Sequence, residues 1–170
     1  CNLLWSTCYG GSLIDEGYGI SVDNANNIFI TGKTGSLNFP VQNLGTAYSQ
    51  ASGGSNDIFI AKFNSSGVSQ WSTYYGGSGN EEGYDIATTA KGDVMVTGQT
   101  LSPNFPTINL LGASAYFQTL YGGGGAFYGD AFMLRFDNGG NRYWSTYYGG
   151  SGEDSALALT TYCGHTYVTG

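Results

Sequence analysis

Charged side chains are scarce in this chain and make up only 10% of its 170 residues, far below the usual quarter of a soluble domain. Five Lys and Arg residues stand against twelve Asp and Glu, which gives a formal net charge of −7. The basic residues are scattered singly and form no basic stripe. The sequence therefore predicts neither a nucleic-acid partner nor attachment to an anionic membrane surface.

Long hydrophobic runs, histidine and cysteine are also sparse. No apolar stretch approaches the roughly 20 residues of a membrane-spanning helix, so no transmembrane segment is expected. Three cysteines without CxxC spacing and a single histidine do not form a zinc-site pattern. Cys1 and Cys8 are too far apart on one expected strand to bond to each other. A disulfide from Cys163 to either of them stays open.

Glycine and tyrosine are abundant, at 29 and 14 residues, whereas proline occurs only 3 times. No strict Gly-X-Y period is present, which excludes a collagen-like chain. Many Gly, Tyr, Thr and Ser residues favour short strands joined by tight turns over helices. Hydrophobic residues make up 41% of the chain, enough to form a core.

One segment, WSTYYGGSG, occurs at residues 71–79 and again at 144–152, and a diverged copy, WSTCYGGSL, occupies residues 5–13. The tryptophans of successive copies are 66 and 73 residues apart. Other segments return in the same order between the copies, including NFP, AYxQ and a VTG or ITG triplet. The chain is therefore a tandem repeat.

Each repeat contains four short runs in which apolar and polar residues alternate, bounded by Gly, Asn and Asp, and such runs predict strands. Four antiparallel strands repeated in tandem are typical of β-propeller blades. We therefore expect an all-β fold. The predicted strands are residues 18–22, 28–32, 58–63 and 71–75 in one repeat, and 84–88, 94–98, 131–136 and 144–148 in the next.

The ordered strings GGSGxEEGYxI, VTGxT, NFP, AYxQ, DxFxx(K/R)F and WSTYYGG resemble the bacterial seven-bladed β-propeller repeat family, over nearly the whole chain. The resemblance implies a secreted or cell-surface bacterial protein. Such proteins are often long chains that carry propellers beside adhesion-type modules. The resemblance carries over no catalytic residues.

The repeats predict one part of a propeller. Residues 1–10 are expected to be the last strand of a preceding blade, 15–76 and 82–149 two full blades, and 155–170 the first two strands of another. Two full blades and two partial ones do not close a ring, which needs at least about four. We expect the chain to be part of a longer polypeptide. In the alternative, neighbouring chains supply further blades and form rings or a fibre.

The longest connections, residues 33–56 and 99–129, are predicted to share one face of the propeller with the Gly-rich acidic connections. Connections of this length usually carry function or structure of their own. This long-loop face is therefore the expected binding surface for a glycan or protein partner. Its candidate contact residues are Tyr48, Tyr116, Tyr121, Phe127 and Tyr128.

Asp15, Glu81 and Asp154 recur once in each acidic connection. Carboxylate and backbone oxygens suit Ca²⁺, so these residues are candidate calcium ligands. In the alternative interpretation each carboxylate accepts hydrogen bonds from its own glycine turn. Their repetition in every blade favours the alternative, and we expect no cofactor.

Other recurring residues have a structural interpretation. Asp57 and Asp130, just before the third strand, are expected to cap the long connections. Trp5, Trp71 and Trp144 are expected to fill the packing between blades, although a sugar-stacking platform is the other possibility.

The sequence contains no GxSxG elbow and no nucleophile, base and acid arrangement. We therefore expect a non-enzymatic, extracellular or cell-surface module with a structural and adhesive role, which binds a partner or builds a surface filament. The alternative function is a secreted hydrolase or lyase acting on polysaccharide, with its active site outside these residues.

Overall fold

The computed structural model describes residues 3–43, 45–112, 115–125 and 129–170. These residues form eleven strands and contain no helix, so the all-β prediction is confirmed. No helix among them is long and apolar enough to cross a membrane. Cys1, Phe127 and Tyr128 lie outside the described residues.

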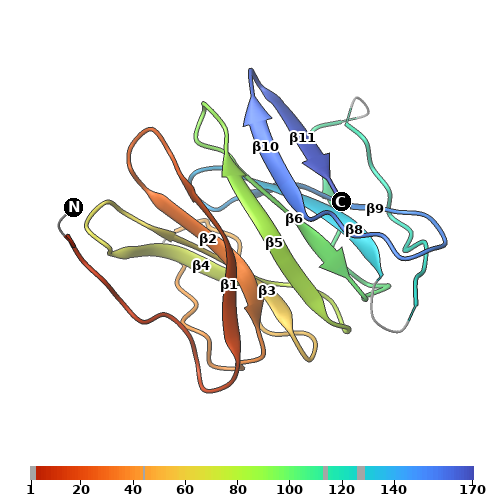
Figure 1. The fold of residues 1–170 in the computed structure, drawn as a ribbon, viewed down its shortest axis with the longest axis horizontal. Helices are drawn as coiled ribbons and strands as arrows, with labels where there is room; N and C mark the ends of the chain where they lie inside the picture. The colour runs from red at the N-terminus through yellow and green to blue at the C-terminus, as the bar shows by residue number, and fades with distance from the viewer. Residues whose placement is uncertain (1–2, 44, 113–114, 126–128) are drawn as a thin grey trace.

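The first repeat forms a four-stranded antiparallel sheet in the order β1-β2-β3-β4 (Figure 1). Short polar turns join β1 to β2 and β3 to β4, so neighbours in sequence are neighbours in the sheet. All four predicted runs lie within these strands. The strands are β1 (Asp15–Val22), β2 (Ile28–Thr34), β3 (Asp57–Phe63) and β4 (Ser69–Tyr75).

The second repeat forms an equivalent sheet with an additional short strand, in the order β5-β6-β8-β9-β7. The added strand, β7, comes from the long connection and pairs with the outer edge of β9. The strands are β5 (Glu81–Thr88), β6 (Val94–Thr100), β7 (Ile108–Asn109), β8 (Asp130–Phe136) and β9 (Arg142–Tyr148).

A hairpin of β10 (Ala158–Tyr162) and β11 (His165–Thr169) follows as a two-stranded sheet. Its turn consists of Cys163 and Gly164, both with positive φ, which is the geometry that tight hairpins favour. Cys8 and Cys163 are exposed and free. The predicted bond from Cys163 to Cys8 is therefore not formed, and one from Cys163 to Cys1, which lies outside the described residues, stays a prediction.

The glycine of the VTG or ITG triplet is required by a close approach of two strands. A Cβ atom at Gly32 would lie 1.9 Å from the carbonyl oxygen of Glu16, and one at Gly98 would lie 1.9 Å from that of Glu82. Both contacts occur beside a β-bulge that has the same register in β1 and β5. The triplet recurs because both repeats have the same bulge, at which only glycine leaves room for the neighbouring strand.

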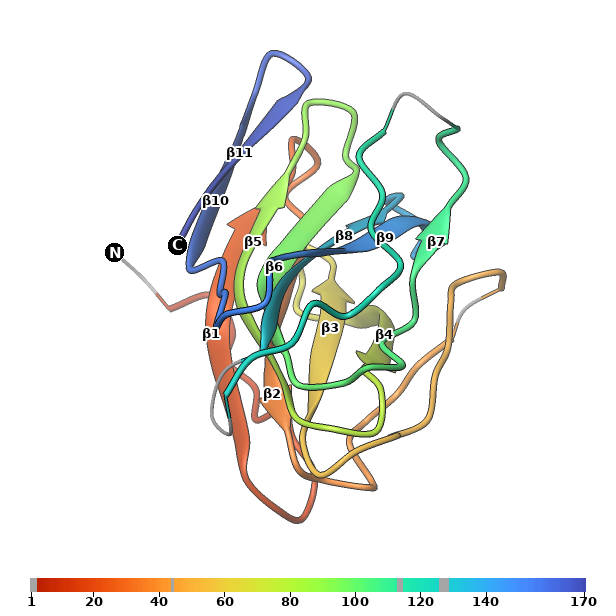
Figure 2. The same ribbon diagram turned by 90° about the vertical axis from the view of Figure 1, so that its right-hand side faces the viewer.

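The first strands of the three sheets, β1, β5 and β10, lie side by side (Figures 1 and 2). The amide N–H of Thr88 in β5 donates to the Ser21 hydroxyl of β1 at 3.1 Å. On its other side, the carbonyl oxygen of Thr88 accepts from the Thr161 hydroxyl of β10 at 2.7 Å. We call β1, β5 and β10 the inner strands.

A common core of aromatic and aliphatic side chains fills the space between the first two sheets. Trp71 stacks on Phe136 with ring centroids 6.0 Å apart, and its indole N–H donates to the Asn138 carbonyl in the next repeat at 3.1 Å. Trp5 makes the same bond to Ser65 at 3.1 Å. These two tryptophans therefore join each repeat to the next, as the structural interpretation predicted.

The expected strand at residues 1–10 is not observed: its described part, residues 3–10, belongs to no strand. Strand structure needs a hydrogen-bonded neighbour, and no described strand pairs with this segment. It is held by side chains instead. The Tyr9 hydroxyl donates to the Pro40 carbonyl at 2.6 Å, and its ring packs edge-on against Phe39 and Phe63.

The long connections return to the outer edge of their own sheets. Gln42 bridges to Ser72 of β4, and Gln118 bridges to Tyr147 of β9. Covering an exposed sheet edge in this way removes unpaired backbone groups. A large part of each long connection therefore completes the sheet.

Candidate functional site

The three predicted calcium candidates each accept a hydrogen bond from a glycine turn. Asp15 accepts from the Gly11 N–H at 2.6 Å. Glu81 accepts from the Gly77 N–H at 3.0 Å, and Asp154 accepts from the Gly150 N–H at 2.8 Å. They lie in three separate connections, so the fold does not assemble them into one cluster.

Tyr48, a predicted partner-binding residue, is partly buried between the first two repeats. The Arg142 guanidinium lies 4.5 Å from its ring centroid, and the Phe136 ring centroid lies at 6.2 Å. Its hydroxyl donates to Gln50 at 2.8 Å. Burial raises the pKa of this hydroxyl. Tyr48 therefore joins two repeats.

Tyr116 is the counterpart of Tyr48 in the second repeat, yet it is 53% exposed. Its ring meets that of Tyr148 edge-on at 5.2 Å. Tyr148 is 55% exposed, whereas its counterpart Tyr75 is fully buried. In the first repeat, the counterparts of this pair are covered by the second repeat. Tyr116 and Tyr148 therefore lie on the side of the second repeat where a following repeat would pack.

Of the remaining predicted contact residues, the structure describes Tyr121. Tyr121 is partly buried and packs against Tyr147, with ring centroids 5.9 Å apart. Phe127 and Tyr128 lie outside the described residues.

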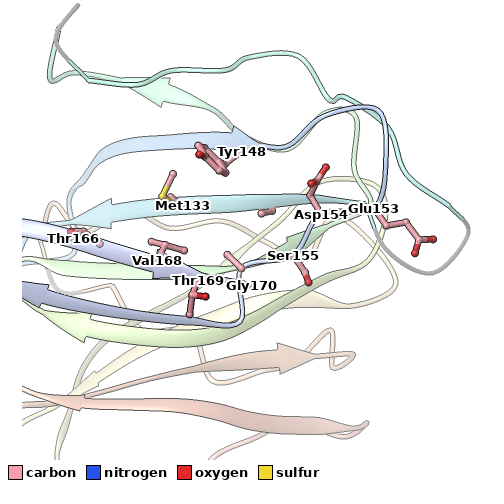
Figure 3. Close-up of a pocket in the computed structure, with 11 residues that line it drawn as sticks. Met133, Tyr148, Glu153, Asp154, Ser155, Thr166, Val168, Thr169 and Gly170 are labelled. Carbon is pink, nitrogen blue, oxygen red and sulfur yellow. The ribbon is translucent and has the colours of Figure 1, made fainter.

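A cavity of about 510 Å³ lies beside the same surface (Figure 3). Its lining includes Met133 of β8, Tyr148 and Val168 of β11. The counterparts of the first and last of these, Ile60 and Val96, are fully buried between the first and second repeats. The cavity therefore corresponds to the packing space between repeats.

A different group of polar side chains stands out on the inner strands. The tripeptide Glu-Gly-Tyr occurs in β1 and again in β5. The Tyr18 hydroxyl donates to Glu16 at 2.5 Å. The Tyr84 hydroxyl donates to Glu82 at 2.6 Å. Residues two apart in a strand share a face, so each carboxylate lies next to its own tyrosine.

Lys33 joins the two tripeptides across the repeat boundary. Its ammonium group lies 3.0 Å from a Glu16 oxygen and 2.8 Å from a Glu82 oxygen. Lys33 is the cross-strand neighbour of Glu16 in the first sheet. The equivalent neighbour of Glu82 is Gln99, whose amide donates to it at 3.3 Å. We call Glu16, Tyr18, Lys33, Glu82 and Tyr84 the inner-strand cluster.

Hydrogen bonding keeps the cluster ionised. The Tyr18 hydroxyl, followed by Lys33, lowers the pKa of Glu16. Burial opposes ionisation of Glu82, but hydrogen bonds from Lys33 and Tyr84 outweigh it and lower its pKa. The bond to Glu82 makes the largest contribution to the raised pKa of Lys33. The two carboxylates and one ammonium group therefore give the cluster a net charge of −1 at neutral pH.

The cluster is open to solvent and offers two aromatic rings beside the charges. Tyr18 is 43% exposed, and the rings of Tyr18 and Tyr84 lie 6.0 Å apart at an angle of 47°. Carboxylate oxygens accept hydrogen bonds, and tyrosine rings stack on flat apolar faces. This combination suits a ligand that carries hydroxyl groups.

The residues of this cluster are not among those that the sequence predicts for a binding site. In the sequence the tripeptide is one part of the repeated motif. The third repeat provides the signal that could have found it, because Ser155, Ala156 and Leu157 replace the tripeptide there. In the third repeat the first strand begins only at Ala158, after these three residues, whereas β1 and β5 include the tripeptide.

Two comparisons with known proteins bear on the family. No curated protein matches the chain significantly. The family model described as Beta-propeller repeat matches residues 4–40, which cover the Trp5 segment, β1 and β2. This match shows a beta-propeller repeat at residues 4–40, and the same motifs return in the second repeat.

Proposed function

We propose that the chain is a non-enzymatic module of an extracellular or cell-surface propeller and that its inner-strand cluster binds a glycan. The observation that carries the proposal is the contrast between two kinds of polar side chain. The carboxylates of the glycine turns are bonded to their own backbone. In the inner-strand cluster the side chains of Glu16 and Tyr18 are exposed to solvent, so a ligand can reach a carboxylate and an aromatic ring there.

The chemistry favours a neutral or amino-bearing sugar over an acidic one. The carboxylate oxygens of Glu16 and Glu82 accept hydrogen bonds from sugar hydroxyls. The rings of Tyr18 and Tyr84 provide stacking surfaces. Both the local charge and the formal net charge of −7 repel an anionic glycan.

The electrostatics of the cluster support binding over hydrolysis. A glycosidase needs one of its two carboxyl groups protonated, with a raised pKa, to act as a general acid. Glu16 and Glu82 instead have lowered pKa values, and Lys33 is bonded to both of them.

The test is equilibrium binding of the native polypeptide to a panel of neutral, amino-bearing and acidic oligosaccharides. Tyr18→Ala is expected to weaken binding of the preferred sugar at least about fivefold, since stacking and the positioning of a carboxylate are lost together (about 1–3 kcal/mol). Tyr167→Ala is the matched control, because Tyr167 is an exposed strand tyrosine outside the cluster. Equal binding by both variants would contradict the proposal, and release of new reducing ends would favour the enzymatic alternative.

A further inference from the structure

Two pairs of carboxyl groups lie at the junctions between repeats, outside the inner-strand cluster. Asp57 at the start of β3 faces Glu81 at the start of β5. Asp130 at the start of β8 faces Asp154, which precedes β10. Asp57, Glu81 and Asp130 are fully buried.

The two members of each pair lie on either side of a glycine. A Cβ atom built on Gly76 would lie 2.2 Å from Asp57 Oδ1 and 2.3 Å from Glu81 Oε2. The two oxygens therefore point at one position and lie within 4.5 Å of each other, the sum of those distances. At the second junction, Asp130 Oδ1 and Asp154 Oδ2 flank Gly149 in the same way, at 3.1 and 2.9 Å.

The oxygens that do not face the glycine have neutral donors. Asp57 Oδ2 accepts from the Ser52 hydroxyl at 2.8 Å and from the Gly53 N–H at 2.9 Å. Glu81 Oε1 accepts from the hydroxyls of Thr100 and Ser102. Asp57 thus caps the long connection, as predicted.

Of the two oxygens that face the glycine at each junction, the one from the third strand has no donor. Asp57 Oδ1 and Asp130 Oδ1 are buried and have no hydrogen-bond partner among the described residues. Within the same part of the chain, no lysine or arginine forms an ion pair with either pair. Two ionised carboxylates this close, of which both are buried at the first junction and Asp130 is buried at the second, are unfavourable when one oxygen is unbonded. A single proton between them removes both penalties.

We propose that each junction is a proton-binding site in which one carboxyl group donates a hydrogen bond to the carboxylate of its partner. At the first junction the proton lies between Glu81 Oε2 and Asp57 Oδ1. Glu81 Oε2 still accepts from the Gly77 N–H through its second lone pair. At the second junction Asp130 and Asp154 share the proton in the same way.

Electrostatics support this arrangement at both junctions. Burial, with the Asp57 charge adding to it, raises the pKa of Glu81. Burial, with the Asp154 charge adding to it, raises the pKa of Asp130. The other titratable groups near these carboxylates are Tyr74, Tyr121 and Tyr147, whose pKa values are also raised and which stay neutral.

A divalent cation fits the donor set less well than a proton. Calcium takes about six to eight oxygen ligands, whereas three of the four oxygens of the first pair already accept hydrogen bonds. No group of three or more acidic, histidine or cysteine side chains suited to a metal occurs among the described residues.

Asp57→Asn tests the proposal because it supplies the missing donor without a proton. The amide oxygen replaces Oδ2 and keeps the bonds from Ser52 and Gly53, while the amide N–H takes the place of Oδ1 and donates to Glu81. A raised pKa stabilises the folded state at acid pH, and this stabilisation is lost as pH rises above the ordinary carboxyl range and through the folded pKa. In that window, the folded state of each pair holds one proton that the unfolded chain has released. Each pair is therefore expected to lower the folding equilibrium constant roughly tenfold for each unit by which the pH rises.

The experiment measures equilibrium unfolding of the native polypeptide from about pH 5 to about pH 9, with EDTA and with added CaCl₂. The wild-type protein is expected to lose stability as pH rises, and Asp57→Asn and Asp130→Asn are each expected to remove one proton from that dependence. Asp15→Asn is the control, because no second carboxylate faces Asp15 among the described residues. Infrared spectroscopy of the wild type is expected to show protonated carboxyl groups at neutral pH.

Two results would overturn the proposal. One is equal pH dependence in the wild type and both Asn variants, together with no protonated carboxyl band. The other is stabilisation by Ca²⁺, abolished by EDTA and by Asp57→Asn, which would make the site a cation site.

Discussion

The tyrosine clamp on the Asn-Phe-Pro turn gives the most quantitative prediction. The Tyr74 hydroxyl, buried under the first sheet, accepts a hydrogen bond from the Phe39 N–H at 2.8 Å and donates to the Ser36 carbonyl at 2.6 Å. Tyr147 makes the same two bonds to Phe105 and Ser102 in the second repeat. One hydroxyl therefore fixes the start of each long connection.

Tyr74→Phe keeps the ring and removes both bonds. The Phe39 N–H keeps a longer bond of 3.4 Å to the Ser36 carbonyl, so each of the two lost bonds counts about 0.5–1.5 kcal/mol. We expect the free energy of unfolding to fall by about 1–3 kcal/mol, measured by equilibrium denaturation in urea. Tyr147→Phe is expected to give a loss of the same size, because its bonds are equivalent.

Tyr167→Phe is the control, since this tyrosine is 55% exposed and its change is expected to stay within about 0.5 kcal/mol. A loss below about 0.5 kcal/mol for both buried variants would refute the reasoning. The turn would then be held by its other contacts.

Three further predictions concern single residues. Gly32→Ala is expected to cost at least about 1–3 kcal/mol of unfolding free energy, because its methyl group would lie 1.9 Å from a carbonyl oxygen; a neutral result in urea denaturation would show that the bulge relaxes. Trp71→Phe is expected to cost about 1–3 kcal/mol, because it removes the bond to the Asn138 carbonyl and part of the buried ring that packs on Phe136, and a loss equal to that of an exposed substitution would argue against its role between repeats. Lys33→Met is expected to raise the pKa values of Glu16 and Glu82, followed by carboxyl NMR titration, and unchanged values would contradict the ion-pair account of the cluster.

The sequence predicted the strands well because the same strand pattern recurs in each repeat. The run Trp-Ser-Thr-Tyr-Tyr returns with the same alternation, and its two later copies lie within β4 and β9. The copy at residues 5–9 shows the limit of this reasoning. This diverged copy, with Cys8 in place of the first tyrosine, forms no strand, because strand structure depends on a neighbour as well as on local pattern.

The candidate site was harder to predict because it depends on register across sheets. Lys33 contacts Glu82, which is 49 residues away in sequence, and no local pattern indicates that contact. The same holds for the carboxyl pair of Asp57 and Glu81. Conversely, Tyr116 was a reasonable binding candidate by its residue type, but its counterpart Tyr48 shows that this position packs between repeats.

The most direct test of the proposed function is an NMR titration of the native polypeptide with the preferred neutral oligosaccharide. We expect chemical-shift changes concentrated at residues 16–18, 33 and 82–84, and their loss in Tyr18→Ala. Changes centred instead on Tyr116 and Tyr148, with the inner-strand cluster unaffected, would contradict the assignment of the cluster as the ligand site.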